Sequence, residues 1–190
     1  MTSATRERLI AAGKKLFSQL GLGQVGLDHV LQQAELTKTT FYNHFSGKEE
    51  LIREVINRHE SELRNSLEEG LQQLGGEDAR DQLHAIFSMI SELHDEGATL
   101  LLNAIAEFPS PNDPTRLAAI GCKEVFRDAI LSRTQKLGVV SPELLSDALV
   151  MVLDGALLNY QISQDEKTLL TARRMAELLI NAAANGPCDS

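Results

Sequence analysis

Short polar and basic side chains gather between Thr37 and Lys48, and their types suit hydrogen bonding to the bases and phosphates of DNA. A lysine donates to guanine O6 and N7, and a threonine offers a hydroxyl to any base and a methyl group to thymine. Ring-bearing or long side chains with a donor reach phosphate oxygens, which fixes position without reading sequence. This chemistry predicts base contacts from Lys38, Thr39 and Thr40, a groove-facing Asn43, and phosphate contacts from Tyr42, His44 and Lys48.

Two helices joined by a tight turn would present these side chains. Thr37 is a good N-cap for the second helix, whose buried face is supplied by Phe41 and Phe45, four residues apart. The turn falls at residues 34–36, and a helical stripe precedes it, formed by Leu27, Val30, Leu31 and Ala34. A further helix over residues 5–20, closed by a C-cap glycine, can bury the other two.

The next helix is expected to begin close to Lys48. Ser46 and Glu49 have the S-x-x-E spacing of a capping box, which places Lys48 in the first helical turn. The unpaired N–H groups and the positive dipole end of that turn also favour a phosphate. The position therefore agrees with the phosphate contact predicted for the Lys48 side chain.

The motifs of this N-terminal part are more specific than a helix, a turn and a helix, which many all-α proteins contain. They are R-E-R-L-I-A-A-G-K-K-L-F from Arg6, L-G-L from Leu20, V-L-x-x-A from Val30 and T-K-T-T-F-Y-N-H-F-S-G-K-E-E-L from Thr37. In these motifs the chain resembles the tetracycline-repressor (TetR) family of bacterial transcription regulators.

The resemblance implies an all-α fold with two domains. Residues 1–48 would form a three-helix, helix-turn-helix DNA-binding domain, and residues 49–190 a helical ligand-binding and dimerisation domain. It also implies that eight residues lie at or near DNA, namely Thr37, Lys38, Thr39, Thr40, Tyr42, Asn43, His44 and Lys48.

Two residues depart from the family pattern. Members usually have Ser or Thr before the second helix, where its hydroxyl caps the helix and can touch a phosphate, but this chain has Gly26. The turn usually holds glycine, but here it holds Glu35, for which a left-handed backbone costs roughly 1 kcal/mol. A lost phosphate contact and a negative charge near DNA would both weaken binding.

The charge is distributed unevenly along the 190 residues. The net charge is −9, yet residues 1–48 hold six basic and three acidic side chains, a net charge of +3. The remaining 12 basic and 24 acidic residues give residues 49–190 a net charge of −12. A basic head on an acidic body concentrates the attraction for phosphates where DNA would dock.

The body of the chain has helical spacing throughout, without a strand pattern. The spacing predicts a long helix from Gly47 to about residue 74, and further helices at about 78–94, 97–108, 113–137, 141–162 and 166–184. The last two are apolar around too much of their circumference for a monomer surface. We interpret them as half of a four-helix dimer interface, the alternative being that they complete the monomer core.

Polar residues within otherwise apolar helices are the candidates for a small-molecule site. Most such residues in proteins are solvated or hydrogen-bonded within the core, so the signal is weak. The candidates are His59, Glu92, Asn103, Glu107, Asp154, Asn159 and Tyr160.

Other functions fit less well. A di-iron helical-bundle enzyme needs E-x-x-H pairs, and no histidine here has Glu three residues before it. The spacing of Cys122 and Cys188 predicts no metal site or disulfide framework, and no cofactor is expected. Without a signal-peptide core or a membrane span, the sequence predicts a cytoplasmic protein. The resemblance and the dimer interpretation imply a homodimeric repressor that binds an inverted-repeat operator and is released by a small molecule. The alternative is a helical protein-interaction adaptor that has lost sequence-specific DNA binding.

Overall fold

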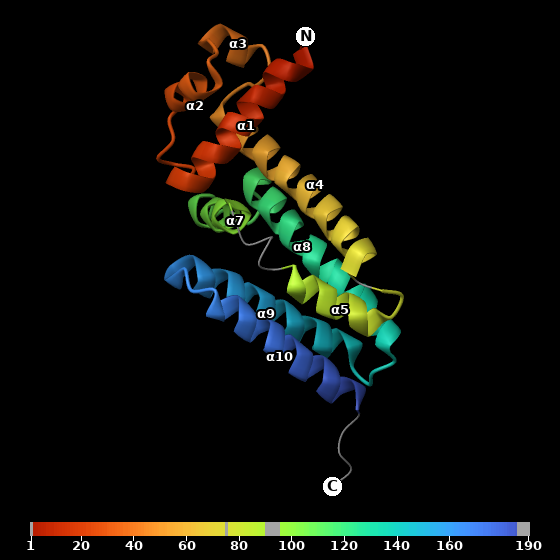
Figure 1. Cartoon of the computed structure of the whole chain (residues 1–190). Coiled ribbons are helices and arrows are strands. Elements are labelled where there is room, and N and C mark those ends of the chain that lie inside the picture. Colours follow the sequence, from red (N-terminus) through yellow and green to blue (C-terminus); the bar gives the residue numbers. More distant parts are fainter. Residues whose placement is uncertain (1, 75, 90–95, 186–190) are drawn as a thin grey trace. The chain divides into compact units, whose positions relative to one another are not determined.

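The chain folds as an all-α protein over the residues that the computed structural model describes, which are 2–74, 76–89 and 96–185 (Figure 1). It divides into two compact units. The first comprises residues 1–61 and 96–122, and the second comprises residues 62–95 and 123–190. The predicted functional boundary at residue 48 is a different division, and it stays a prediction.

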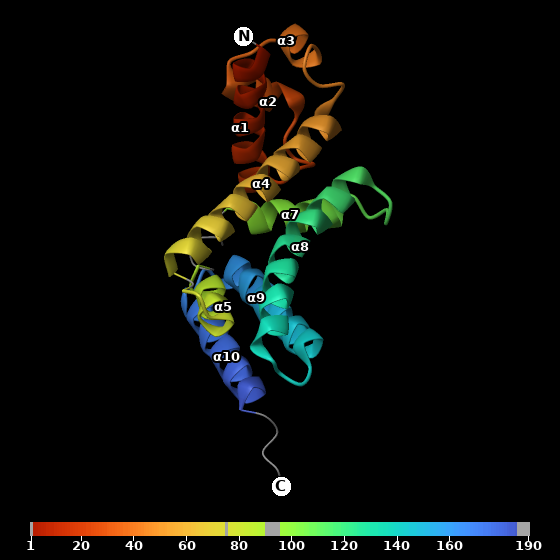
Figure 2. The same ribbon diagram turned by 90° about the vertical axis from the view of Figure 1, so that its right-hand side faces the viewer.

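The first unit contains the three N-terminal helices. It is built from α1 (Thr2–Leu20), α2 (Leu27–Ala34), α3 (Lys38–Tyr42), the start of α4 (Lys48–Leu74), α7 (Glu96–Glu107) and the start of α8 (Pro114–Thr134). In Figure 2, α2 lies beside α1, with which it is in contact, and α7 also packs against α1. The apolar side chains of the first unit form one core, whose largest members include Leu9, Phe17, Phe41, Phe45, Ile52 and Leu100.

The helix ends in this unit follow the local signals of the sequence. Gly21 terminates α1 with φ of +87°, which glycine adopts without strain. Glu35 ends α2 in the left-handed region at φ 53° and ψ 48°, as its place in the turn predicted. Thr37 caps α3 as expected.

The cap of α4 differs from the prediction. Because α4 begins at Lys48, its N-cap is Gly47, and the third helical residue is Glu50. The Glu50 carboxylate therefore accepts hydrogen bonds from both the N–H and the hydroxyl of Ser46, each at 2.6 Å. These bonds lower the pKa of Glu50. The predicted pairing of Ser46 with Glu49 was wrong by one position.

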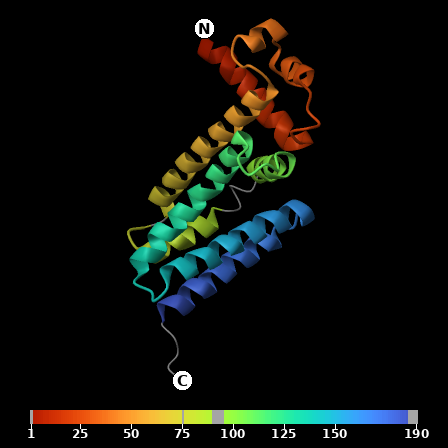
Figure 3. The same cartoon turned by 180° about the vertical axis from the view of Figure 1, so that it is seen from behind.

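The second unit is a helical bundle. Besides the ends of α4 and α8 it contains α5 (Ala79–Ser88), α9 (Pro142–Ser163) and α10 (Lys167–Ala184). Figure 3 shows α9 and α10 side by side along their length, and α10 also packs against α5. Its core includes Leu67, Leu83, Ile86, Phe87, Ile130, Leu149, Leu153 and Ile180.

The predicted helices of the body are confirmed over the described residues. The helix predicted at about 78–94 is seen as α5, which ends at Ser88, and residues 90–94 of that prediction lie outside the described part. Asp113 caps α8 by accepting from the N–H groups of Thr115 and Arg116 at 2.7 and 3.4 Å. A 3-10 turn at Gln135–Leu137 continues α8 to the predicted end. None of the helices in the described part of the chain is both long and apolar enough to cross a membrane.

A close contact fixes α4 within the second unit. A Cβ built at Gly70 would overlap the Sδ atom of Met89, whose side chain is buried. Gly70 therefore provides the space in which Met89 packs.

We predict that Gly70→Ala destabilises the protein. Alanine gains about 1 kcal/mol over glycine inside a helix, but the clash with a buried side chain costs about 1–3 kcal/mol. Urea unfolding at a fixed protein concentration should show a net loss of about 1 kcal/mol. In a Met89→Ala background the same change should stabilise the protein, and stabilisation in the parent would contradict the role of Met89.

Candidate nucleic-acid interface

Helix α3 presents the residues predicted to read DNA. The Thr37 hydroxyl accepts from the Thr40 N–H at 3.2 Å, and the hydroxyl oxygens of Thr37 and Thr40 lie 2.9 Å apart. Phe41 and Phe45 are buried with stacked rings, 5.5 Å between centroids. The opposite face is accessible: Thr37, Lys38, Thr39, Tyr42 and Asn43 are exposed, while Thr40 and His44 are half-buried.

The Lys38 ammonium has a partner within the head. It lies 2.9 Å from a carboxylate oxygen of Asp28, in the first turn of α2, and this hydrogen bond raises the pKa of Lys38. Both side chains are exposed, so solvent screens the pair and it contributes little to stability. Lys38 can therefore exchange Asp28 for a base or phosphate at little cost.

Lys48 is held differently. Its half-buried ammonium donates to the carbonyl oxygens of Leu22 and Val25 at 2.8 and 3.0 Å. A phosphate contact by this side chain would require giving up two charge-assisted hydrogen bonds, which are stronger than neutral ones. The geometry favours an internal role for Lys48, while its predicted contact with phosphate stays a prediction.

The turn between α2 and α3 compensates for its glutamate. Arg8 donates to the Ala34 carbonyl at 2.6 Å and lies 3.7 Å from the Glu35 carboxylate. It thereby caps the end of α2 and opposes the negative charge of Glu35. Gly26 caps the start of α2 without a side-chain hydrogen bond, as its lack of a hydroxyl predicted.

The predicted ligand contacts are divided between the two units. Glu92 lies outside the described residues. Three of the others, His59, Asn103 and Glu107, belong to the first unit, and three, Asp154, Asn159 and Tyr160, lie on α9 in the second. These contacts stay predictions.

The α9 candidates already have partners in the protein. The Asp154 carboxylate lies 2.5 Å from the ammonium of Lys123, and the Asn159 amide donates to the Gly155 carbonyl at 2.7 Å. Tyr160 packs against the core of the second unit. Structural roles therefore explain these polar groups without a ligand.

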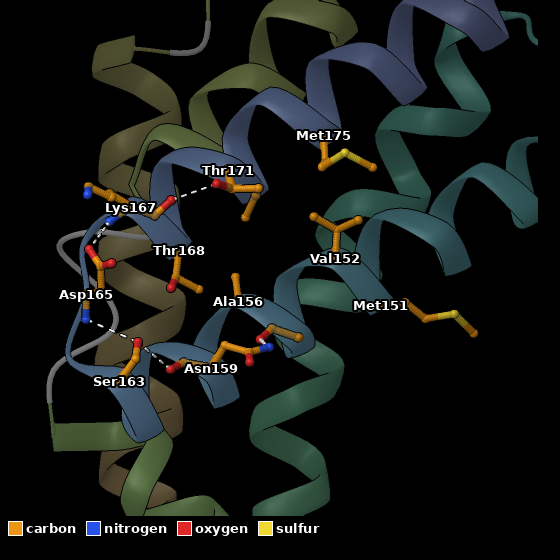
Figure 4. Close-up of a pocket in the computed structure, with 12 residues that line it drawn as sticks. Met151, Val152, Ala156, Asn159, Ser163, Asp165, Lys167, Thr168, Thr171 and Met175 are labelled. Carbon is orange, nitrogen blue, oxygen red and sulfur yellow. Dashed lines mark hydrogen bonds between the residues drawn. The ribbon is translucent and has the colours of Figure 1, made fainter.

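A hollow of about 530 Å³ lies between α9 and α10 (Figure 4). Its polar end holds Asn159, Ser163, Asp165 and Thr168, whereas Met151 and Met175 lie toward the other end. The Ser163 hydroxyl donates to the Asn159 carbonyl at 2.9 Å, so part of the polar lining is already hydrogen-bonded.

Cys122 is fully buried in the first unit. Burial raises the pKa of its thiol to about 12, and its Sγ lies 3.6 Å from the Ile56 carbonyl oxygen. The thiolate is the reactive form of cysteine, so this group is a packing residue near neutral pH. Cys188 lies outside the described residues.

Comparisons with known proteins agree with this geometry. The family model for bacterial regulatory proteins of the tetR family matches residues 9–55. The chain is 25% identical over 171 residues to the HTH-type transcriptional repressor DhaR of a Mycobacterium species, covering 86% of each protein. It is 36% identical over 83 residues to the HTH-type transcriptional repressor NemR of Escherichia coli, covering 44% of this chain and 41% of NemR. The crystal structure of a TetR-family transcriptional regulator from Streptomyces coelicolor has a TM-score of 0.88 at 25% identity, covering 96% of this chain and 97% of the other.

Lys38 and Lys48 offer a matched test of which lysine meets DNA. Lys38→Met should weaken DNA binding and reduce the slope of log affinity against log salt by up to about 1, because an ammonium at the DNA surface no longer displaces a counterion from the phosphates. Lys48→Met should weaken binding without changing that slope, because it removes the hydrogen bonds to the Leu22 and Val25 carbonyls and no contact with DNA.

The two variants should be compared by fluorescence anisotropy on one duplex at several salt concentrations. Equal reductions in slope would contradict the internal role of Lys48 and support its predicted phosphate contact.

Proposed function

Because the chain belongs to the tetR family, whose members are DNA-binding transcription regulators and not enzymes, we propose that it is a homodimeric repressor. The dimer binds an inverted-repeat operator through two copies of α3 and is released by a small-molecule effector. We also propose a cytoplasmic location, because its relatives come from bacteria, whose chromosomal DNA lies there.

The single observation that carries this proposal is the accessible polar face of α3 above an aromatic core. A recognition helix must offer its first residues to base edges, while its other face holds it rigidly to the domain. Thr37 caps α3, and Phe41 and Phe45 anchor it. Lys38 and Thr39 then lie exposed at its start.

The surface of α9 and α10 supports a dimer. Their inner faces are buried in the second unit, yet several large apolar side chains remain exposed, among them Leu144, Met151, Leu158, Ile162, Leu170, Met175 and Leu178. Apart from the backbone of α9 itself, none of the described atoms lies within 4 Å of a Cβ built at Gly155, which leaves room for a helix to approach closely. Completion of the monomer core would not need this outer surface, so the dimer is the better explanation.

Dimerisation explains how the protein would recognise its operator. Two recognition helices about 34 Å apart enter successive major grooves on one face of DNA, which gives an inverted repeat. An effector that binds the DNA-incompetent conformation more tightly would release the operator, and a coupling of 1–3 kcal/mol changes affinity about 5- to 150-fold. DhaR and NemR are named as repressors, whereas FasR of Mycolicibacterium smegmatis, 26% identical over 165 residues, is named as an activator. The repression proposed here follows DhaR and NemR.

The first test is selection of bound duplexes from a random pool with the purified protein, followed by titrations at two salt concentrations. We expect an inverted repeat bound with a Kd on the order of 1 nM, and weaker binding at higher salt. Retention of DNA without sequence preference would contradict the proposal of a repressor and support the alternative, a protein-interaction adaptor.

A second test addresses the dimer. Met151→Glu should convert the protein to monomers in sedimentation velocity and lower operator affinity at least tenfold, because it places an unpaired charge in the interface. Leu117→Glu is the matched control, since Leu117 is an exposed apolar residue of α8 in the first unit. A dimeric Met151→Glu protein would contradict the proposed interface.

A further inference from the structure

The loop between α1 and α2, residues 21–26, determines where α2 begins. Leu22 and Val25 are completely buried, so the loop is anchored in the core of the first unit. Gly21 has a positive φ, which ends α1 and begins the loop. Because α2 leads directly through the turn to α3, a shift of this loop would shift the recognition helix.

A carboxylate from α7 lies against this loop. Glu107 accepts a hydrogen bond from the Leu22 N–H at 3.1 Å. A Cβ built at Gly23 would lie only 2.9 Å from the other carboxylate oxygen, closer than side-chain carbons come in proteins. Residue 23 therefore has no space for a side chain while Glu107 is in place, although its backbone is not in the left-handed region.

Lys48 holds the same loop from α4. It donates to the Leu22 and Val25 carbonyls, so an anion accepts from an N–H of the loop while a cation donates to its C=O groups. Charge-assisted bonds of this kind are roughly twice as strong as neutral ones. Glu107 is the last residue of α7 and Lys48 is the first residue of α4, so both ionic groups are carried by helix ends that border the loop.

We propose that Glu107 is a positioning residue for DNA reading, which it serves by holding the α1–α2 loop through the Leu22 N–H. The inference rests on the proposed function, because it assigns Glu107 to the placement of the recognition helix. It also gives Glu107 a role other than the ligand contact predicted from sequence.

The test combines Glu107→Ala, Glu107→Gln, Gly23→Ala and the double variant Glu107→Ala with Gly23→Ala. Three quantities are measured: affinity for the selected operator, affinity for an unrelated duplex of equal length, and the exchange rate of the Leu22 amide hydrogen. Gln24→Ala is the control, because it shortens an exposed side chain of the same loop.

We expect Glu107→Ala to lower operator affinity about tenfold, the scale of one lost charge-assisted hydrogen bond. Affinity for the unrelated duplex should not fall, and the Leu22 amide should exchange faster. Gly23→Ala should reproduce these effects by displacing the carboxylate, and should add nothing in the Glu107→Ala background. Glu107→Gln should keep most of the affinity, because its amide oxygen still accepts.

Three results would overturn the inference. One is unchanged operator affinity and unchanged Leu22 exchange in Glu107→Ala; a second is equal loss on both duplexes, which indicates general unfolding. The third is a Gly23→Ala effect no larger than that of Gln24→Ala. If the wild-type protein selects no operator, the proposed function fails, and Leu22 exchange still decides independently whether Glu107 holds the loop.

Discussion

A helix of five residues is too short to be stable in water, and this constraint governs the DNA-binding part of the molecule. Helix α3 exists because Phe41 on its inner face and Phe45, three residues beyond its end, are buried in the core, and because Thr37 caps its first turn. The helices beneath it are joined by ion pairs, with Arg6 on α1 2.9 Å from Glu54 on α4. The direction in which the polar face points is therefore a property of the packed unit and not of α3 itself.

The same unit uses most of its described positive charges internally. Arg8 caps α2, Lys38 pairs with Asp28, and Lys48 holds two carbonyl groups. The net positive charge of this part still attracts DNA at a distance. Close contact with a phosphate, however, requires a basic side chain to give up its partner within the protein. That exchange is easy at an exposed pair and costly at a half-buried one, so the basic residues of the head are not equivalent to one another.

The sequence predicted those features that depend on near neighbours. Helix ends were predictable because capping acts over a few residues, as at Gly21, Thr37 and Asp113. The pairing of Ser46 was missed by one position, because the exact start of a helix depends on its backbone and not only on spacing. The partner of Glu107 could not be predicted at all: it is a backbone N–H 85 positions away, and only tertiary folding brings the two together.

The close approach of Glu107 to Gly23 has a consequence for evolution. A methyl group at position 23 and a full-length carboxylate at position 107 compete for one space, so the two positions are not free to change independently. Homologues with a larger residue at position 23 should carry a shorter or redirected side chain at position 107, and then need another acceptor for the loop N–H. The space at residue 23 is thus limited by a side chain of α7, which lies far from it in the sequence.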